Sequence, residues 1–411
     1  MSRAFTLRKL AWTDPPLCEI ELPKRAMVLR SSFGSGLARR ARDIPGRVWA
    51  IGDRGPNLKV RTAIERYGLD HLAPLAEIEG AKIMPRPDTG PTIAELRVGH
   101  GRVELIRSRR IAHDHGPVSG LPIPACDHLH SEPVFDLDGR ALAPDSGGLD
   151  TEGIAAFSDG SFWVGDEFGP SLVRIDREGK VLLRLVPETL QLEAPYRVQP
   201  SLPAIAARRQ LNRGFEALAL SHDEKWLFLA FQSPLAHPDE AAHKQARHVR
   251  IWRLDAASGA LAAQYAYPLD PPESFARDRA LGPFGGDDVK VSEIAWLGGD
   301  SLLVLERGSE TTKLYRIEAS PELLLPPEHL EIATRPSVEE LSGRDGGFPL
   351  PCLAKELLFT SDDARELPAD MEGMALLSGN EILLVNDSDF GVEGAETSFW
   401  ILAFDRPLRR G

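Results

Sequence analysis

One short pattern of apolar and polar positions returns five times along the chain. Each copy opens with a short run of small and apolar residues, usually led by Glu, followed by a turn and an apolar strand with a polar end. The opening runs are SGLA (35–38), EGIA (152–155), EALA (216–219), EIAW (293–296) and EGMA (372–375). The apolar strands end at Asp53, Asp166, Gln232, Glu306 and Asp387. Each copy therefore predicts two adjacent antiparallel strands.

Most copies continue into a third and a fourth strand. Turn sequences such as Asp176-Arg-Glu-Gly179 and Asp255-Ala-Ala-Ser-Gly259 separate these strands. Self-similar four-stranded units are typical of a β-propeller. We therefore expect an all-β fold, a single β-propeller over residues 1–411 with four-stranded antiparallel blades and a long insertion between two blades at about 114–149.

The pattern predicts five blades, and the long gap before Glu152 leaves room for a sixth. The last copy has no fourth strand of its own. The N-terminal stretch 5–22 is a candidate for that strand. Pairing it with the last copy would close the ring and leave no open sheet edge.

Acidic residues gather where the copies are expected to meet. The first strand of each propeller blade lines the central channel, so equivalent positions form a ring. Glu152, Glu216, Glu293 and Glu372 should form one tier at a channel mouth, with Ser35 in the fifth position. The polar strand ends should form a second tier. Carboxylates this close need a counter-charge, and Ca²⁺, which takes about six to eight oxygen ligands, suits them.

These tiers give two overlapping sets of candidate residues. The predicted Ca²⁺ ligands are Glu152, Glu216, Glu293, Glu372, Asp53, Glu306 and Asp387. The candidate catalytic carboxylates are Glu152, Asp166 and Glu167, and either Glu152 or Asp166 would act as the base. A second interpretation is structural, because a repeated Glu can also accept hydrogen bonds from the backbone of the neighbouring blade.

Basic residues are interleaved with the acids. Arg54 follows Asp53, Arg307 follows Glu306, and two more cations precede the glutamates, Arg213 and Lys290. The guanidinium group has the planar shape that binds phosphate and carboxylate. These four residues are the candidate substrate-binding cations. Internal ion pairs with the acidic tiers are the alternative.

Two further stretches could bind metal ions. The stretch NDSDFGVE (386–393) resembles the start of a calcium loop, although it follows a strand and lacks EF-hand spacing. His113, His115, Cys126, His128 and His130 lie close together in the long insertion, but their spacing matches no standard zinc pattern.

Composition narrows the choice of partners. The chain of 411 residues carries a net charge of −13, which argues against a nucleic-acid partner and favours a cation. Its three cysteines form no metal or disulfide pattern, and no apolar stretch is long enough to span a membrane. The N-terminus shows no export signal, so the location is cytoplasmic by default, or periplasmic or secreted if a signal was removed. We expect a monomer that acts on a small molecule.

The run GLDTEGIAAFSDGSFWVGDEFGPSLVRIDREGKVL (148–182) resembles the phytase-like domain family, "esterase-like activity of phytase". Supporting stretches are WAIGDRGPN (49–57), RGFEALALSHDEKWLFLAFQSPL (213–235), SEIAWLGGDSLLVLERG (292–308) and DMEGMALL (370–377). The resemblance covers about residues 30 to 405. It implies a propeller and a calcium-dependent hydrolysis of phosphoesters or esters.

Three functions remain open on the sequence. The first is a Ca²⁺-dependent hydrolase for an anionic phosphoester or a carboxylic ester at the acidic mouth. The second is a non-catalytic propeller that binds a ligand or partner protein and holds Ca²⁺ structurally. The third is a lactonase-type Ca²⁺ enzyme. Either enzyme function requires an acidic channel mouth that is open to solvent. The non-catalytic function predicts a channel filled by side chains and glutamates that accept hydrogen bonds from backbone amides.

Overall fold

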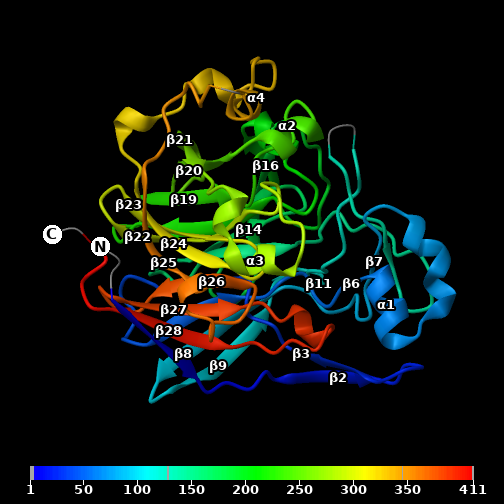
Figure 1. Cartoon of the computed structure of the whole chain (residues 1–411). Coiled ribbons are helices and arrows are strands. Elements are labelled where there is room, and N and C mark those ends of the chain that lie inside the picture. Colours follow the sequence, from blue (N-terminus) through cyan, green and yellow to red (C-terminus); the bar gives the residue numbers. More distant parts are fainter. Residues whose placement is uncertain (1–3, 127–128, 345, 410–411) are drawn as a thin grey trace.

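Five sheets of four or five strands, almost all antiparallel, surround a central channel. Figure 1 shows their strands as arrows. The computed structural model describes residues 4–126, 129–344 and 346–409. The first strands of the sheets lie side by side in a closed ring, in the order β4, β13, β18, β22 and β26, and β26 contacts β4 again. This arrangement is a five-bladed β-propeller and confirms the predicted fold.

The strands of each blade follow one another along the chain. Blade 1 contains β4 (Gly36–Ala38), β5 (Arg47–Ile51), β8 (Thr92–Gly99) and β9 (Arg102–Arg110). Blade 2 contains β13 (Thr151–Ala156), β14 (Phe162–Asp166), β15 (Ser171–Ile175), β16 (Val181–Pro187) and a parallel fifth strand, β17 (Val198–Leu202). Blade 3 contains β18 (Phe215–Leu220), β19 (Trp226–Phe231), β20 (His248–Asp255) and β21 (Leu261–Pro268). Blade 4 contains β22 (Lys290–Gly298), β23 (Ser301–Arg307), β24 (Thr312–Glu318) and β25 (Lys355–Thr360).

Blade 5 joins the two ends of the chain. It contains β26 (Met371–Leu376), β27 (Glu381–Asn386), β28 (Phe399–Phe404) and the N-terminal strand β1 (Phe5–Leu10). Strand β1 pairs along its whole length with β28, from Phe5 opposite Phe404 to Leu10 opposite Phe399. Just beyond it, Ala11 exchanges backbone hydrogen bonds with blade 1. The predicted closure of the ring by the N-terminal stretch is thus confirmed.

Truncation of a buried side chain in β1 should weaken this closure. Leu10 is buried between blades 5 and 1. Leu10→Ala is expected to lower the free energy of unfolding by about 2–5 kcal/mol, measured by urea titration. The matched control is Arg8→Ala on the exposed face of the same strand, which should change stability by less than about 0.5 kcal/mol. Equal effects of the two substitutions would contradict the closure.

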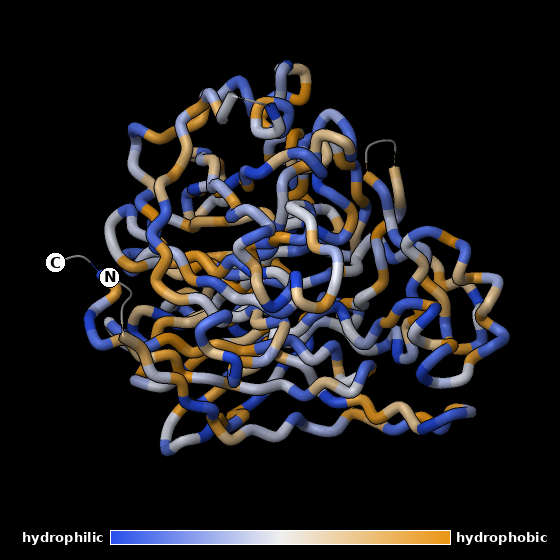
Figure 2. The backbone as a smooth tube through the Cα atoms, in the orientation of Figure 1, coloured by the Kyte–Doolittle hydropathy of each residue, from blue (hydrophilic) through white to orange (hydrophobic). Residues whose placement is uncertain are grey.

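Apolar clusters continue from blade to blade around the ring. One cluster joins blades 2, 3 and 4, and three more lie between blades 4 and 5, 5 and 1, and 1 and 2. Within the largest, Trp252 contacts the rings of Phe215 and Phe231 edge to face, with centroids 5.8 and 5.1 Å away. In Figure 2, hydrophobic and hydrophilic residues are interspersed along the tube, in the blades as well as in the outer loops.

Connections between the blades carry the remaining elements. A small sheet of β6 (Leu58–Lys59), β7 (Lys82–Ile83) and β12 (Val134–Phe135) lies beside helix α1 (Val60–Tyr67) at the right of Figure 1. This sheet draws on the segments before Glu152, so they form no sixth blade within the described residues. The hairpins are β2 (Pro16–Ile20) with β3 (Met27–Arg30), and β10 (Ala112–His113) with β11 (Gly116–Pro117). The other helices are α2 (Glu240–Gln245), α3 (Ala276–Leu281) and α4 (Val338–Ser342). Among the described residues no helix has the length and apolar character to cross a membrane.

Candidate functional site

Irregular strand pairing determines which residues surround the acidic end of the channel. In four of the first strands the pairing shifts by one residue, directly after the pairs Thr151–Asp166, Phe215–Phe231, Val291–Glu306 and Met371–Asn386. Such a bulge places one extra residue opposite the partner strand. The extra residues are Glu152, Glu216, Ser292 and Glu372, and Ser35 holds the equivalent position before β4. We call these five residues the inner tier.

Glu293 does not belong to the inner tier, contrary to the sequence pattern. It pairs with Leu305 one position after the bulge, where the other strands carry Gly153, Ala217 and Gly373. Its carboxylate crosses the channel and accepts hydrogen bonds from the backbone N–H groups of Leu37 (3.0 Å) and Ile294 (3.1 Å). Glu293 is fully buried and therefore has the structural role that was the second interpretation.

The same one-residue offset changes the second tier. Counted from the bulges, the equivalent positions at the ends of the second strands are Asp53, Glu167, Gln232, Arg307 and Asp387, of which Arg307 still pairs with Lys290. We call them the outer tier. Asp166 and Glu306 lie one position earlier, where they pair with Thr151 and Val291 of the first strands. Glu167 and Arg307 therefore occupy the outer-tier positions that the sequence pattern had assigned to Asp166 and Glu306.

Asp166 and Glu306 are buried in networks away from the channel. Asp166 accepts hydrogen bonds from the backbone of Asp150 (2.8 Å), Ser171 Oγ (2.6 Å) and Arg184 Nη2 (2.7 Å). The Glu306 carboxylate accepts from Tyr267 Oη and Lys355 Nζ, both at 2.7 Å. With both carboxylates engaged in this way, we assign them to the framework of the site rather than to catalysis or metal binding.

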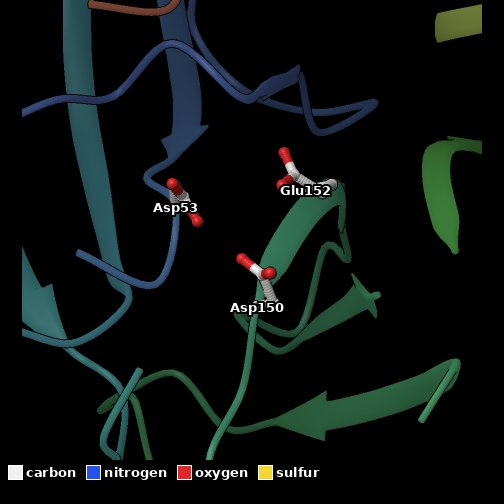
Figure 3. A group of neighbouring side chains, drawn as sticks. All are labelled: Asp53, Asp150 and Glu152. Atoms are coloured by element: carbon white, nitrogen blue, oxygen red, sulfur yellow. The ribbon is translucent and has the colours of Figure 1, made fainter. Parts of the chain in front are cut away.

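Three carboxylates converge at the junction of blades 1 and 2. Asp53 follows β5, and Asp150 and Glu152 lie at the start of β13 (Figure 3). One oxygen from each of the three lies within 4.8 Å of the others, which is close enough to hold one metal ion. Asp150 is only 2% exposed, and its Oδ1 has no hydrogen-bond partner within the described part of the chain. A buried carboxylate oxygen without a partner is costly, so Asp150 Oδ1 is a candidate ligand atom for a cation.

Burial and neighbouring charges raise the pKa values of two of these three carboxylates. Burial, reinforced by the charge of Asp150, raises the pKa of Asp53 well above its usual range. Burial and the charges of Glu216 and Asp53 likewise raise the pKa of Glu152. Carboxylates in close proximity favour either a shared proton or a bound cation. A divalent cation would relieve this repulsion.

Asp53 also belongs to a second acidic group, with Asp387 and Asp389. Their ligand oxygens again lie within 4.8 Å of one another. Asp387 accepts a hydrogen bond from Ser32 Oγ (2.5 Å) and a longer one from Ser35 Oγ (3.4 Å). Asp387 and Asp389 come from the calcium-loop-like stretch, so the structure brings that stretch next to the main acidic group.

Two of the four predicted cations are already paired. Arg54 is buried, binds the Glu132 carboxylate and lies 3.3 Å from Asp150 Oδ2. Arg307 is also buried and donates to Glu372, to Asp370 (3.0 Å) and to Ser292 Oγ (2.8 Å). Both arginines therefore position acidic residues and have little capacity left for a substrate.

Lys290 and Arg213 remain available at the channel. Both side chains are half-buried. Burial and the charges of Arg307 and Arg213 lower the pKa of Lys290. No hydrogen bond or ion pair of its side chain occurs among the described residues. Within the described part of the chain, Arg213 donates only to the backbone carbonyl of Asp287. These two cations therefore lie close together with donors to spare.

The inner-tier glutamates differ in their partners. Glu216 is 3% exposed, and its Oε2 is unpaired among the described residues. Burial and the charge of Glu372 raise the pKa of Glu216 to about 7. Burial raises the pKa of Glu372 to about 8 although its partner Arg307 opposes the rise. Glu167 accepts a hydrogen bond from the backbone of Gly214 (2.8 Å), whereas Glu216 Oε2 has no partner among the described residues. Of these two carboxylates, Glu216 therefore has the oxygen that is free to accept a proton.

The sequence reasoning missed Asp150 and Asp370, although a signal was present. Both precede an inner-tier Glu by two residues, in the parallel sequences Asp150-Thr-Glu-Gly153 and Asp370-Met-Glu-Gly373. Blade 4 carries Lys290 at the equivalent place before Ser292. The repeated Asp-x-Glu-Gly pattern would have identified both aspartates.

The histidines of the long insertion show no metal-binding arrangement where the structure describes them. His113 and His115 are ring neighbours, with centroids 5.9 Å apart, and no group of ligands forms around them among the residues described. His128 lies outside the described residues. The zinc interpretation gains no support.

The fold and this site define a β-propeller with an acidic channel mouth. The family model "Esterase-like activity of phytase" matches residues 33–390. The chain therefore belongs to the Phytase-like family, as the resemblance of its central run predicted.

Individual relatives are distant. A protein of Arthroderma benhamiae named "Uncharacterized secreted protein" is 26% identical over 304 residues, which are 64% of this chain and 55% of that protein. The chain thus spans only about half the length of this curated relative. An aldose sugar dehydrogenase from Streptomyces coelicolor shares 11% identity at a TM-score of 0.33, over 98% of this chain and 99% of that one. A gluconolactonase from Xanthomonas campestris shares 10% identity at a TM-score of 0.35, over 97% of each chain.

Proposed function

We propose that the protein is a divalent-cation-dependent hydrolase that acts on a phosphoester or carboxylic ester at the acidic mouth. Membership in the Phytase-like family supports hydrolysis of this class. The observation that carries the proposal is the group of Asp53, Asp150 and Glu152, in which the buried Oδ1 of Asp150 has no hydrogen-bond partner among the described residues.

The donor set suits Ca²⁺ better than Zn²⁺. All three side chains offer hard carboxylate oxygens, and the group contains no His or Cys. Asp387 and Asp389 extend the oxygen ligands to a neighbouring second position that shares Asp53. When bound, the cation would polarise a phosphoryl or carbonyl oxygen of the substrate.

The chain's own residues provide the other functions. Lys290 and Arg213 would bind the anionic part of the substrate beside the carboxylates, since their donors are free for this. Glu216 would accept the proton of the attacking water through its unpaired Oε2, because general bases work best with a pKa near the operating pH. Arg54 and Arg307 would keep Asp150 and Glu372 in place.

A non-catalytic propeller is the second candidate. Glu293 crosses the channel and accepts backbone hydrogen bonds, which is what the scaffold interpretation required. However, Glu293 does not close the acidic mouth. Glu152 is half-buried there, and the side chain of Lys290 has no partner among the described residues. We therefore favour the enzyme. The secreted character of the Arthroderma protein supports an exported location for this chain as well.

A substrate panel with and without chelator tests the proposal. The panel contains p-nitrophenyl phosphate, bis(p-nitrophenyl) phosphate, p-nitrophenyl butyrate and a δ-lactone, each assayed with CaCl₂ and with EDTA. Hydrolysis of at least one compound that EDTA removes and CaCl₂ restores is expected. Hydrolysis that persists in EDTA would contradict the role of the cation. Saturable Ca²⁺ binding without hydrolysis of any compound would favour the scaffold.

A further inference from the structure

A pocket of about 410 Å³ opens at the channel end opposite the acidic site. Its floor is a belt of apolar side chains, one from each first strand: Leu37, Ile154, Leu218, Ile294 and Met374. All five are buried. Because these residues follow the inner tier along each strand, the belt separates the pocket from the acidic mouth. We call this space the rear pocket.

Alanines in register create the space of the rear pocket. Each first strand places an alanine directly after the apolar belt: Ala38, Ala155, Ala219, Ala295 and Ala375. Their partners on the second strands are large, including Trp49, Trp163 and Phe228. Five small side chains around one axis leave a cavity that larger residues would fill. The volume lies within the range of small-molecule pockets, about 300–1,000 Å³.

The rim of the rear pocket is cationic in a protein that is acidic as a whole. Arg39, Arg40, His222 and Arg409 line it, whereas none of its lining residues among those described is Asp or Glu. Burial, together with the charges of Arg409 and Arg39, lowers the pKa of His222, so both arginines lie close enough to His222 to act on it. Asp43, which does not line the pocket, accepts a hydrogen bond from Trp49 Nε1 (2.8 Å) and is a counter-charge to Arg39 and Arg40. Since the net charge is −13, this concentration of basic lining residues is local.

The arginines at the rim have free donor capacity. Arg39 donates through Nη1 to the carbonyls of Leu376 (3.0 Å) and Leu377 (2.8 Å) and through Nε to that of Arg47 (3.3 Å), which holds the guanidinium at the pocket edge and leaves Nη2 for a ligand. Arg409 is exposed and lies 5.5 Å from the ring of Trp296. A guanidinium held beside an aromatic wall is suited to a carboxylate.

We propose that the rear pocket binds an amphipathic carboxylate, with its head group at Arg39 and Arg409 and its apolar chain along the alanine-lined channel. The apolar belt forms the end of the site. This binding is separate from the hydrolase site, because neither the acidic residues nor a cation takes part in it.

Isothermal titration with decanoate, in EDTA, tests the proposal on the full chain. Decanol, which has the same chain length and no charge, is the comparison ligand. Wild type is expected to bind decanoate at least about tenfold more tightly than decanol, as one charge-assisted contact would provide. Arg409→Gln should weaken decanoate binding about tenfold, and Ala295→Leu, which fills the pocket, should abolish it.

Arg406→Gln is the matched control, because Arg406 is an exposed arginine near the same chain end and does not line the pocket. It should bind decanoate as wild type does. Equal affinity for decanol and decanoate, undiminished binding by both Arg409→Gln and Ala295→Leu, or no binding by wild type would each overturn the proposal. Arg409→Gln changes only an exposed side chain, so its effect on decanoate binding does not depend on repacking of the channel.

Discussion

Replacement of Asp53 by Asn is expected to abolish the stabilisation that Ca²⁺ gives to the protein. Wild type should gain about 2.7 kcal/mol at a Ca²⁺ concentration about 100 times the dissociation constant. Asp53 contributes to both acidic groups, so this substitution removes a ligand from each. Without Ca²⁺, the variant should be at least as stable as wild type, because it removes a carboxylate whose pKa is raised by burial and by Asp150.

Asp166→Asn is the matched control for this prediction. Asp166 ends the equivalent strand of the next blade but pairs with Arg184 in a fully buried network. Its replacement should cost about 3–5 kcal/mol without Ca²⁺, because Arg184 loses its counter-charge. The gain with Ca²⁺ should remain. Urea titrations of the three proteins with and without CaCl₂ measure both effects. A full Ca²⁺ response in the Asp53 variant would refute the assignment of the site.

Glu216→Gln is expected to lower kcat by about 10²–10⁴-fold on any substrate that the panel identifies. Glutamine preserves the size of the side chain but cannot accept the proton of the attacking water. The Ca²⁺ stabilisation should persist, because Glu216 lies outside the group of Asp53, Asp150 and Glu152. Steady-state kinetics and Ca²⁺ titration on the same preparation measure both quantities.

Comparison of Glu152→Gln with Glu216→Gln distinguishes the loss of a metal ligand from the loss of a general base. The Glu152 variant should lose Ca²⁺ stabilisation and activity together, whereas Glu216→Gln should lose activity alone. The role of Glu216 as base is contradicted if its variant keeps more than about half of the wild-type kcat. Loss of Ca²⁺ response in the Glu216 variant would instead make Glu216 a ligand.

The repeat pattern was sufficient to predict the propeller, because each copy contained its own strands and turns. It also predicted that the N-terminal stretch completes the last blade, since that copy lacked a fourth strand. Both conclusions depend on local patterns that the strands preserve. The small sheet of β6, β7 and β12 was not predicted, because each of its strands is only two residues long. In addition, β12 is separated in sequence from its pairing partner β7 by all of blade 1's outer strands.

Single-residue register limited the prediction of the site. Glu293 resembles Glu152, Glu216 and Glu372 in its local sequence. However, the bulge in blade 4 falls at Ser292, and the Glu293 carboxylate instead crosses the channel to the backbone N–H of Leu37. A one-residue shift exchanges the faces of a strand, and the sequence pattern does not locate the bulge. The same offset removed Asp166 and Glu306 from the outer tier.

Long-range pairing explains the other differences. Arg54 was a candidate for substrate binding, but it pairs with Glu132 and Asp150, which lie in the long insertion and at its end. No local pattern links residues this far apart. The alanines of the rear pocket, in contrast, were visible in every copy of the repeat, and only the ring arrangement shows that they surround one cavity.

An anomalous difference map from crystals grown with CaCl₂ tests the central assignment most directly. We predict a peak with ligand distances of about 2.3–2.6 Å to carboxylate oxygens of Asp53, Asp150 and Glu152. Asp150 Oδ1, which has no partner among the described residues, should be one of the ligands. The absence of a peak at this group, or a peak bound by Glu293 or Asp166 instead, would contradict the account.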